Sequence, residues 1–183
     1  MEEKVWKAEL AEEKVIVWDK EGAKNIFDSG WYGELFEDRL ELALVEAMLL
    51  LERKKIEITK GKKKKISFKD FHDYCLKIDP RFKIRYTVYR DLRERGLPVR
   101  TGFKFGCDFR VYERGVTPIK KGPKAAHEHT KWIVFTVSED YNCSFQELSR
   151  AVRLAHNIRA NMLWAVVDNE NDVTYYSITY LSL

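Results

Sequence analysis

The first half of the chain mixes short apolar runs with helical spacings. Residues 14–18 form an apolar run typical of a buried strand, and a turn at 19–22 precedes a short helix that ends at Gly30. Leucine, valine and alanine recur at helical spacings over residues 40–54 and occupy more than one face. This pattern predicts a helix that is buried on several sides.

Polar residues then mark the next boundaries. Residues 56–59 predict a strand, and Gly61 with four lysines at 62–65 predicts a hairpin-like tip. Ser67, followed three residues later by Asp70, indicates the start of a helix that continues to about residue 78. Asp79 and Pro80 interrupt it, and a long helix at 81–95 is capped by Gly96.

The pattern changes after Gly96, where strands predominate. Strands are expected at 97–101, 104–112, 132–137, 162–168 and 173–181, with a loop rich in glycine, proline and lysine at 113–128. Ser144 and Glu147 have the spacing of a capping box before a helix that runs to about residue 160. The sequence therefore predicts two small α/β (α+β) domains, at 1–82 and 83–183, the second a sheet covered by a helix on each side.

Composition narrows the class of protein. The chain has 183 residues, of which 45% are hydrophobic and 13% aromatic, and this is enough to build real cores and to exclude wholesale disorder. Lys and Arg number 33 against 29 Asp and Glu, an excess too small to indicate nucleic-acid binding by itself. No signal peptide and no apolar run of the roughly 20 residues needed to cross a membrane is found, so a soluble cytoplasmic protein is expected.

The three cysteines do not predict a special site. Cys75, Cys107 and Cys143 are an odd number without a close pair, which argues against a disulfide framework or a cysteine metal centre. Small buried residues in a reducing compartment explain them.

Three segments resemble the archaeal tRNA-splicing endonuclease (tRNA-intron lyase) family. They are residues 30–52, residues 86–115 and residues 128–181, and the match extends over nearly all of the chain beyond residue 14. The middle segment carries the most specific signature, a helix ending in RxRG followed by TGxKxGxDFRxYxRG. The resemblance implies an α/β N-terminal domain and a C-terminal catalytic nuclease domain. It also implies a homo- or hetero-oligomer, either a dimer of dimers or a tetramer, that recognises a bulge–helix–bulge shape in precursor tRNA.

The reaction implied by the resemblance is RNA cleavage without a metal or another cofactor, leaving a 2′,3′-cyclic phosphate and a 5′-hydroxyl. The family uses a tyrosine, a histidine and a lysine for it. Tyr112 matches the tyrosine, although an unperturbed phenol, with a pKa of about 10, is a poor base without the help of nearby cations such as Arg110 and Arg114. His129 matches the histidine, and an imidazole that titrates near about 6.5 suits a general acid. His127 lies two residues away and remains an alternative.

The lysine position is occupied by Ala160, which directly follows Arg159. An alanine cannot stabilise developing charge, and loss of one such group costs about 10²–10³ in rate by analogy with an oxyanion-hole donor. Two explanations stay open: an engineered, inactive lysine-to-alanine variant, or a natural non-catalytic structural subunit of a heteromeric enzyme. The survival of Tyr112 and His129 favours the first. For either explanation, we expect the phenol and the imidazole to meet in one solvent-accessible pocket beside the helix end at residue 160.

The resemblance also implies roles in RNA binding and assembly. Arg153, seven residues before Ala160, matches an arginine that clamps a bulge base, and two helical turns would put both residues on one face. A solvated arginine that pairs with Glu147 or Asp168 is the alternative.

The loop with Asp168, Glu170 and Asp172 matches an assembly loop that enters a basic groove of another subunit, although a plain polar hairpin also explains it. The aromatic last strand is expected to be covered by a subunit interface. A metal-dependent DNA nuclease is a third possibility, but Asp108 is its lone candidate ligand.

Overall fold

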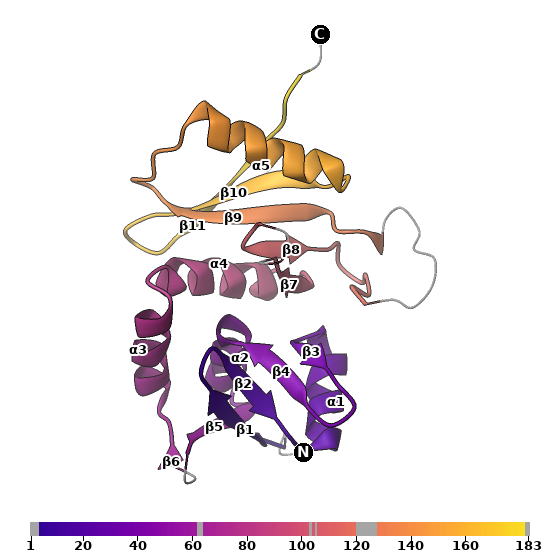
Figure 1. The fold of residues 1–183 in the computed structure, drawn as a ribbon, viewed down its shortest axis with the longest axis vertical. Coiled ribbons are helices and arrows are strands. Elements are labelled where there is room, and N and C mark those ends of the chain that lie inside the picture. The colour runs from indigo at the N-terminus through magenta and orange to yellow at the C-terminus, as the bar shows by residue number, and fades with distance from the viewer. Residues whose placement is uncertain (1–3, 62–63, 103, 105, 120–127, 182–183) are drawn as a thin grey trace. The chain divides into compact units, whose positions relative to one another are not determined.

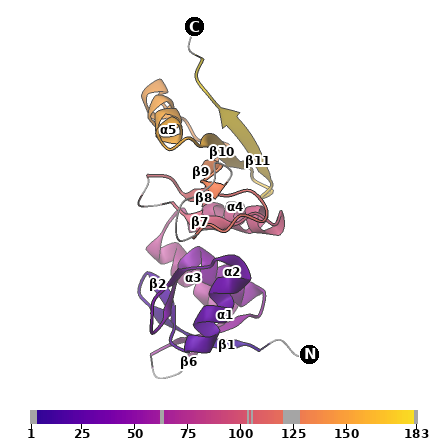
Figure 2. The same cartoon turned by 90° about the vertical axis from the view of Figure 1, so that its right-hand side faces the viewer.

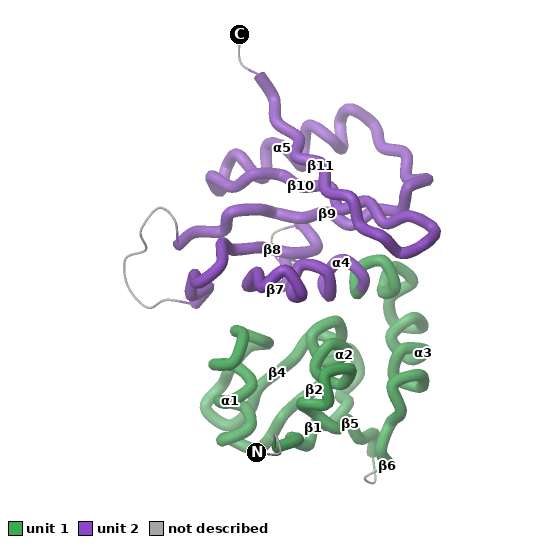
Figure 3. The backbone as a smooth tube through the Cα atoms, turned by 180° about the vertical axis from the view of Figure 1, so that it is seen from behind, with its two compact units in different colours: residues 1–86 green, residues 87–183 purple. Residues whose placement is uncertain are grey.

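The structure of the chain is a computed structural model that describes residues 4–61, 64–102, 104, 106–119 and 128–181. Contacts divide the chain into two compact units, residues 1–86 and residues 87–183 (Figure 3). Each unit contains its own sheet. No helix among the described residues is long and apolar enough to cross a membrane.

The first unit is built on a six-stranded sheet with the strand order β3-β4-β2-β1-β5-β6 (Figure 1). β1 and β5 pair in parallel, and the remaining neighbours are antiparallel. The strands are β1 (Trp6–Ala11), β2 (Lys14–Val17), β3 (Glu34–Leu35), β4 (Leu40–Ala43), β5 (Ile56–Lys60) and β6 (Lys64–Lys65). The helices are α1 (Lys20–Gly30), α2 (Leu44–Glu52) and α3 (Phe68–Ile78).

The prediction of one helix over residues 40–54 was wrong for its first turn. Leu40 and Leu42 are fully buried and alternate with partly exposed neighbours in β4, which pairs with β2. The helix begins after Ala43, where the Glu46 carboxylate accepts the backbone N–H of Ala43 at 2.9 Å. A continuous apolar run suits a strand and a helix equally, so spacing alone could not divide it.

The second unit is a five-stranded sheet with the order β11-β10-β9-β8-β7, in which β9 and β10 are parallel and the other pairs antiparallel. Its elements are β7 (Val99–Thr101), β8 (Phe109–Val111), β9 (Trp132–Ser138), α5 (Phe145–Asn157), β10 (Asn161–Val167) and β11 (Val173–Ile178), with α4 (Phe82–Glu94) leading into it. The mixed α/β architecture with two sheets confirms the predicted fold class.

Helices α4 and α5 lie on opposite faces of this second sheet (Figure 2). On one face, Tyr89 of α4 packs against Phe109 of β8 with ring centres 5.5 Å apart. On the other, Ala151 and Ala155 of α5 join Ile133 and Met162 in one buried cluster. α5 connects the parallel strands β9 and β10, and residues 158–160 separate its C-terminal end from the first residue of β10.

Candidate active site

Three neighbouring strands of the second sheet have one end on the same side of the sheet, which is called here the edge formed by these strand ends. Val111 closes β8, Trp132 opens β9 and Asn161 opens β10, and the register pairs Trp132 with both of the others. Lys131 extends this arrangement by one residue. Its N–H donates to the Val111 carbonyl at 2.9 Å and its own carbonyl accepts from the Asn161 N–H at 2.8 Å.

The residues just beyond these strand ends are therefore close neighbours in the backbone. Tyr112 follows Val111, His129 lies two residues before Lys131, and Ala160 precedes Asn161. Adjacent strands are about 4.8 Å apart, so the three positions gather at one edge of the sheet although they are far apart in the sequence. His127, the alternative to His129, lies outside the described residues.

The two candidate side chains differ in accessibility. His129 is exposed, whereas Tyr112 is only 3% exposed and its backbone N–H donates to the Pro98 carbonyl at 3.0 Å. The expected exposure of the phenol is therefore wrong. Strand-end position is visible in the sequence, but burial depends on neighbours brought in by the fold. The catalytic role of Tyr112 stays a prediction.

Helix α5 ends before Ala160 in a Schellman motif. The Ala160 N–H donates to the Ala155 carbonyl at 2.9 Å, and the Arg159 N–H donates to the His156 carbonyl at 3.0 Å. Arg159 itself adopts a left-handed conformation with φ of 56°. Ala160 then turns inward and packs, partly buried, against the cluster that contains Ala155 and Met162.

This ending corrects the relation expected between Arg153 and Ala160. The helix stops at Asn157 instead of residue 160, so the two residues do not share a helical face. Arg153 is exposed, and its Nε donates to the Ser149 carbonyl of the same helix at 3.3 Å. The expected alternative partners are otherwise engaged, since Glu147 caps α5 at the Ser144 N–H and Asp168 organises its own turn.

The acidic turn between β10 and β11 is held by hydrogen bonds to the first of its acidic residues. One carboxylate oxygen of Asp168 accepts the backbone N–H groups of Glu170 and Asp172, both at 2.9 Å. Asn171 supplies the left-handed residue of the turn, with φ of 68°. The side chains of Glu170 and Asp172 remain exposed, so the turn presents their carboxylates to its surroundings.

Lys131 is a charged residue at this edge that the sequence interpretation passed over. Its ammonium lies 2.9 Å from the carboxylate of Glu113, the residue after Tyr112, and both side chains are more than two-fifths exposed. The feature of the sequence that could have identified Lys131 as a candidate is its position two residues after His129. Arg114, expected to support Tyr112, donates instead to the Arg95 carbonyl at 2.9 Å.

Asp108, the candidate metal ligand, is a buried structural residue. Its Oδ2 accepts from the Thr136 N–H at 2.8 Å and from the Thr136 hydroxyl at 3.0 Å. Within the described ranges, no group of three or more His, Cys, Asp and Glu side chains is arranged to hold a metal ion.

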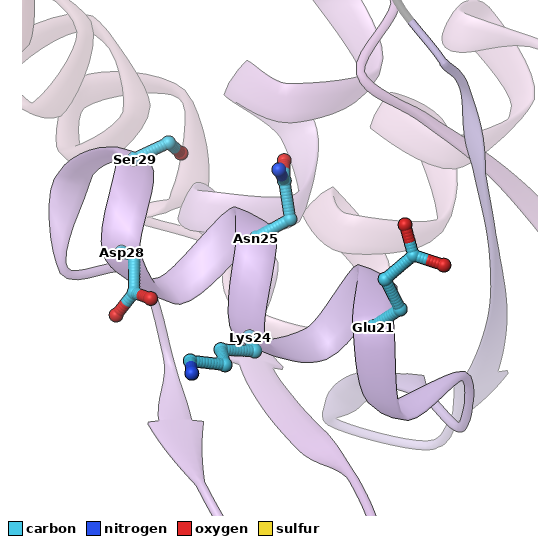
Figure 4. A pocket seen from close by; sticks show the side chains of 5 residues that line it. All are labelled: Glu21, Lys24, Asn25, Asp28 and Ser29. Atoms are coloured by element: carbon cyan, nitrogen blue, oxygen red, sulfur yellow. The ribbon is translucent and has the colours of Figure 1, made fainter.

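The hollows in the described surface include two that lie away from the strand ends that carry Tyr112, Lys131 and Ala160. One of about 470 Å³ lies along α1, where the side chains that line it project from successive turns (Figure 4); they are Glu21, Lys24, Asn25, Asp28 and Ser29. Another of about 230 Å³ lies between α5 and the sheet and is lined by Phe135, Trp164 and Arg150 among others. Neither is lined by Tyr112, His129 or Ala160.

Comparison with known proteins matches both units of the chain. Residues 6–72 match the model of the tRNA intron endonuclease N-terminal domain, and residues 82–175 match that of the tRNA intron endonuclease catalytic C-terminal domain. The tRNA-splicing endonuclease of Methanococcus vannielii is 39% identical over 176 residues, which cover 96% of this chain and 94% of that protein. The tRNA-splicing endonuclease of Thermococcus kodakarensis is 37% identical over 172 residues, or 94% and 96% of the two chains.

One relative is longer than this chain, and the match covers about half of that relative. The tRNA-splicing endonuclease of Methanosarcina mazei is 39% identical over 172 residues, which cover 93% of this chain and 47% of that protein. Both domains and nearly the full length thus agree with archaeal tRNA-splicing endonucleases. This chain belongs to the tRNA intron endonuclease family of enzymes.

Proposed function

We propose that the chain is a subunit of a metal-independent tRNA-splicing endonuclease that cleaves precursor tRNA at bulge–helix–bulge splice sites. The observation that carries this proposal is the match of both domains to tRNA-splicing endonucleases. The hydrogen bonds of Lys131 to β8 and β10 support it further, because they place the backbone at positions 112 and 160 on either side of Lys131, which follows His129 by two residues.

The proposed reaction is an internal transesterification. The ribose 2′-oxygen forms a bond to phosphorus, and the bond from phosphorus to the 5′-oxygen of the next nucleotide breaks. Tyr112, acting as phenolate, accepts the 2′ proton, and protonated His129 gives a proton to the departing 5′-oxygen. No water is consumed, and the products are a 2′,3′-cyclic phosphate and a 5′-hydroxyl.

Ala160 weakens this site because it leaves the charge on the phosphate without the family's lysine. The chain is in this respect a lysine-to-alanine form. If no other cation takes over the role of that lysine, cleavage is about 10²–10³-fold slower than that of a variant with the lysine restored, the loss typical of one charge-stabilising group.

The burial of Tyr112 favours a second candidate function, that of a non-catalytic structural subunit. A phenol that is 3% exposed cannot accept a proton from RNA until binding or assembly uncovers it. Together with Ala160, this observation fits a chain that supports the site of a catalytic partner chain. In that case Ala160→Lys alone produces no cleavage, and activity requires co-expression with the partner.

RNA binding and assembly use the exposed features of the second unit. The guanidinium of Arg153 is available to stack on an extruded base. β11 lies at the edge of its sheet with Tyr176 55% exposed, and an edge strand of this kind is a template for pairing with another subunit. The acidic turn with Asp168, Glu170 and Asp172 is suited to a basic groove of a further subunit in a homo- or hetero-oligomer.

The proposal is tested with the purified chain and a synthetic bulge–helix–bulge RNA in EDTA. The unaltered chain and Ala160→Lys are compared in single-turnover cleavage, and light scattering reports whether the chain assembles alone. Faster cleavage by Ala160→Lys supports the endonuclease subunit. Cleavage by neither protein, with full activity only after co-expression with a catalytic chain, supports the structural subunit.

A further inference from the structure

We propose that Lys131 is a catalytic residue that supplies the cation missing at Ala160. This inference rests on the proposed function and assigns a further residue to the same site. During the reaction its ammonium would contact the non-bridging phosphate oxygens while the 2′-oxygen attacks and the 5′-oxygen departs. It neither gains nor loses a proton, so the proton transfers of Tyr112 and His129 are unchanged.

The backbone fixes Lys131 at the centre of the strand ends. Its N–H is bonded to the last residue of β8 and its carbonyl to the first residue of β10. The side-chain amide of Asn161 donates to the same carbonyl at 3.3 Å. Lys131 therefore lies one strand spacing, about 4.8 Å, from the backbone on each side, next to the positions of Tyr112 and Ala160.

The side-chain ammonium of Lys131, like its backbone, contacts the chain near the end of β8. It meets the carboxylate of Glu113 at 2.9 Å, and Glu113 is bonded covalently to Tyr112. The charge is thus held at the residue that directly follows Tyr112 in the chain. Lysine has a flexible four-carbon stem, so its charge can move by several ångströms without a change in the backbone.

Lys131 can readily exchange its ion pair with Glu113 for an ion pair with a phosphate. The side chains of Lys131 and Glu113 are 44% and 42% exposed, and an ion pair in that environment contributes little to stability. An RNA phosphate offers the same ammonium a second anionic partner. Glu113 would hold the lysine near the site when RNA is absent and compete with RNA when it is present.

Arg159 is the main rival for this role. It is exposed, it directly precedes Ala160, and a guanidinium binds phosphate well. Its left-handed backbone is already explained by the Schellman motif that ends α5. No hydrogen bond joins it to β8 or β9 among those described, whereas Lys131 is bonded to both flanking strands.

The test measures single-turnover cleavage of a bulge–helix–bulge RNA in EDTA by the full chain at saturating protein. Lys131→Gln should slow cleavage about 100-fold, and Lys131→Arg should retain most of the rate because it retains the charge. Glu113→Gln should cleave faster than the unaltered chain, because it removes the carboxylate that competes with the phosphate for Lys131. Lys24→Gln, which removes one exposed charge from α1, is the matched control and should cleave normally. The double variant Lys131→Gln/Ala160→Lys should recover the rate, which excludes misfolding as the cause of the loss.

The outcomes separate this inference from the proposed function. If Ala160→Lys cleaves and Lys131→Gln remains within about twofold of the unaltered chain, a change smaller than the loss of one charged contact, Lys131 has no catalytic role. Lys131 also has no catalytic role if Ala160→Lys cleaves and the unaltered chain does not. The conclusion is again the same if Arg159→Gln alone abolishes cleavage. If neither the unaltered chain nor Ala160→Lys cleaves, the proposed function fails and this inference fails with it.

Discussion

The Lys131 carbonyl accepts the backbone N–H of Asn161 at 2.8 Å, and this bond ties the start of β10 to the segment that carries His129. Because β9 and β10 are parallel, the two segments arrive at the same edge of the sheet after the chain has passed through α5. The candidate histidine and the position of the missing lysine are thus brought together by backbone pairing and do not depend on a side-chain contact.

The left-handed residue that ends α5 predicts a stabilising substitution. Arg159 has φ of 56°, a conformation that costs a residue with a Cβ about 1 kcal/mol and glycine nothing. Arg159→Gly should raise the free energy of unfolding by up to about 1 kcal/mol in urea titrations. Arg153→Gly, inside the same helix, is the matched control and should lower it by about 1 kcal/mol. If Arg159→Gly and Arg153→Gly lowered the free energy of unfolding by the same amount, the left-handed conformation of Arg159 would be contradicted.

The buried carboxylate of Asp108 predicts a large loss of stability. Asp108→Ala leaves the N–H and hydroxyl of Thr136 without the acceptor they now share, and an unsatisfied buried donor costs about 1–3 kcal/mol. Thermal and urea unfolding should both show a loss of about 2 kcal/mol or more. Asp172→Ala, at an exposed side chain, should change stability little. Equal effects of the two substitutions would show that Asp108 is not a structural acceptor.

The capping box of α5 predicts a pH dependence of stability. The Ser144 N–H, and then the Tyr141 hydroxyl, donate to the Glu147 carboxylate and lower its pKa from the ordinary value of 4.5. A group with a lowered pKa stabilises the fold above its unfolded value and loses this effect as pH falls through the folded one. The melting temperature should therefore fall less steeply between about pH 6 and pH 3 in Glu147→Gln than in the unaltered chain. Glu170→Gln is the charge-matched control. If the melting temperatures of the two variants fell equally steeply with pH, the stabilising role of the Glu147 cap would be contradicted.

The three cysteines should differ in reactivity. Cys143 is exposed, whereas burial raises the pKa of Cys75 to about 12 and that of Cys107 to about 11. At about pH 8 a thiol-specific reagent should label one cysteine quickly and the other two only after unfolding. Cys143→Ser should remove the fast phase. Rapid labelling of two or three thiols in the native protein would contradict the described burial.

The sequence predicted those features that depend on local chemistry. The caps of α3 and α5 are visible as Ser67 with Asp70 and Ser144 with Glu147, and both form as expected. β1 was missed although its buried and exposed residues alternate strictly, a pattern that by itself predicts a half-buried strand. Each of these features is decided within a few residues.

The features that the sequence did not predict depend on tertiary structure. The burial of Tyr112 is decided by neighbours from elsewhere in the fold. The end of α5 at Asn157 depends on a left-handed arginine, where glycine would have signalled the stop. The central position of Lys131 follows from hydrogen bonds to two strands that lie 20 and 30 residues away in the chain.

The most direct test of the account is the chemistry of the RNA ends made by Ala160→Lys. In EDTA, this variant should cut a bulge–helix–bulge RNA into fragments with a 2′,3′-cyclic phosphate and a 5′-hydroxyl. His129→Ala in the same background should slow that cleavage by about 10²–10⁴, the contribution of a general acid. Products with a 3′-hydroxyl and a 5′-phosphate, a requirement for a metal ion, or cleavage unaffected by His129→Ala would contradict the account.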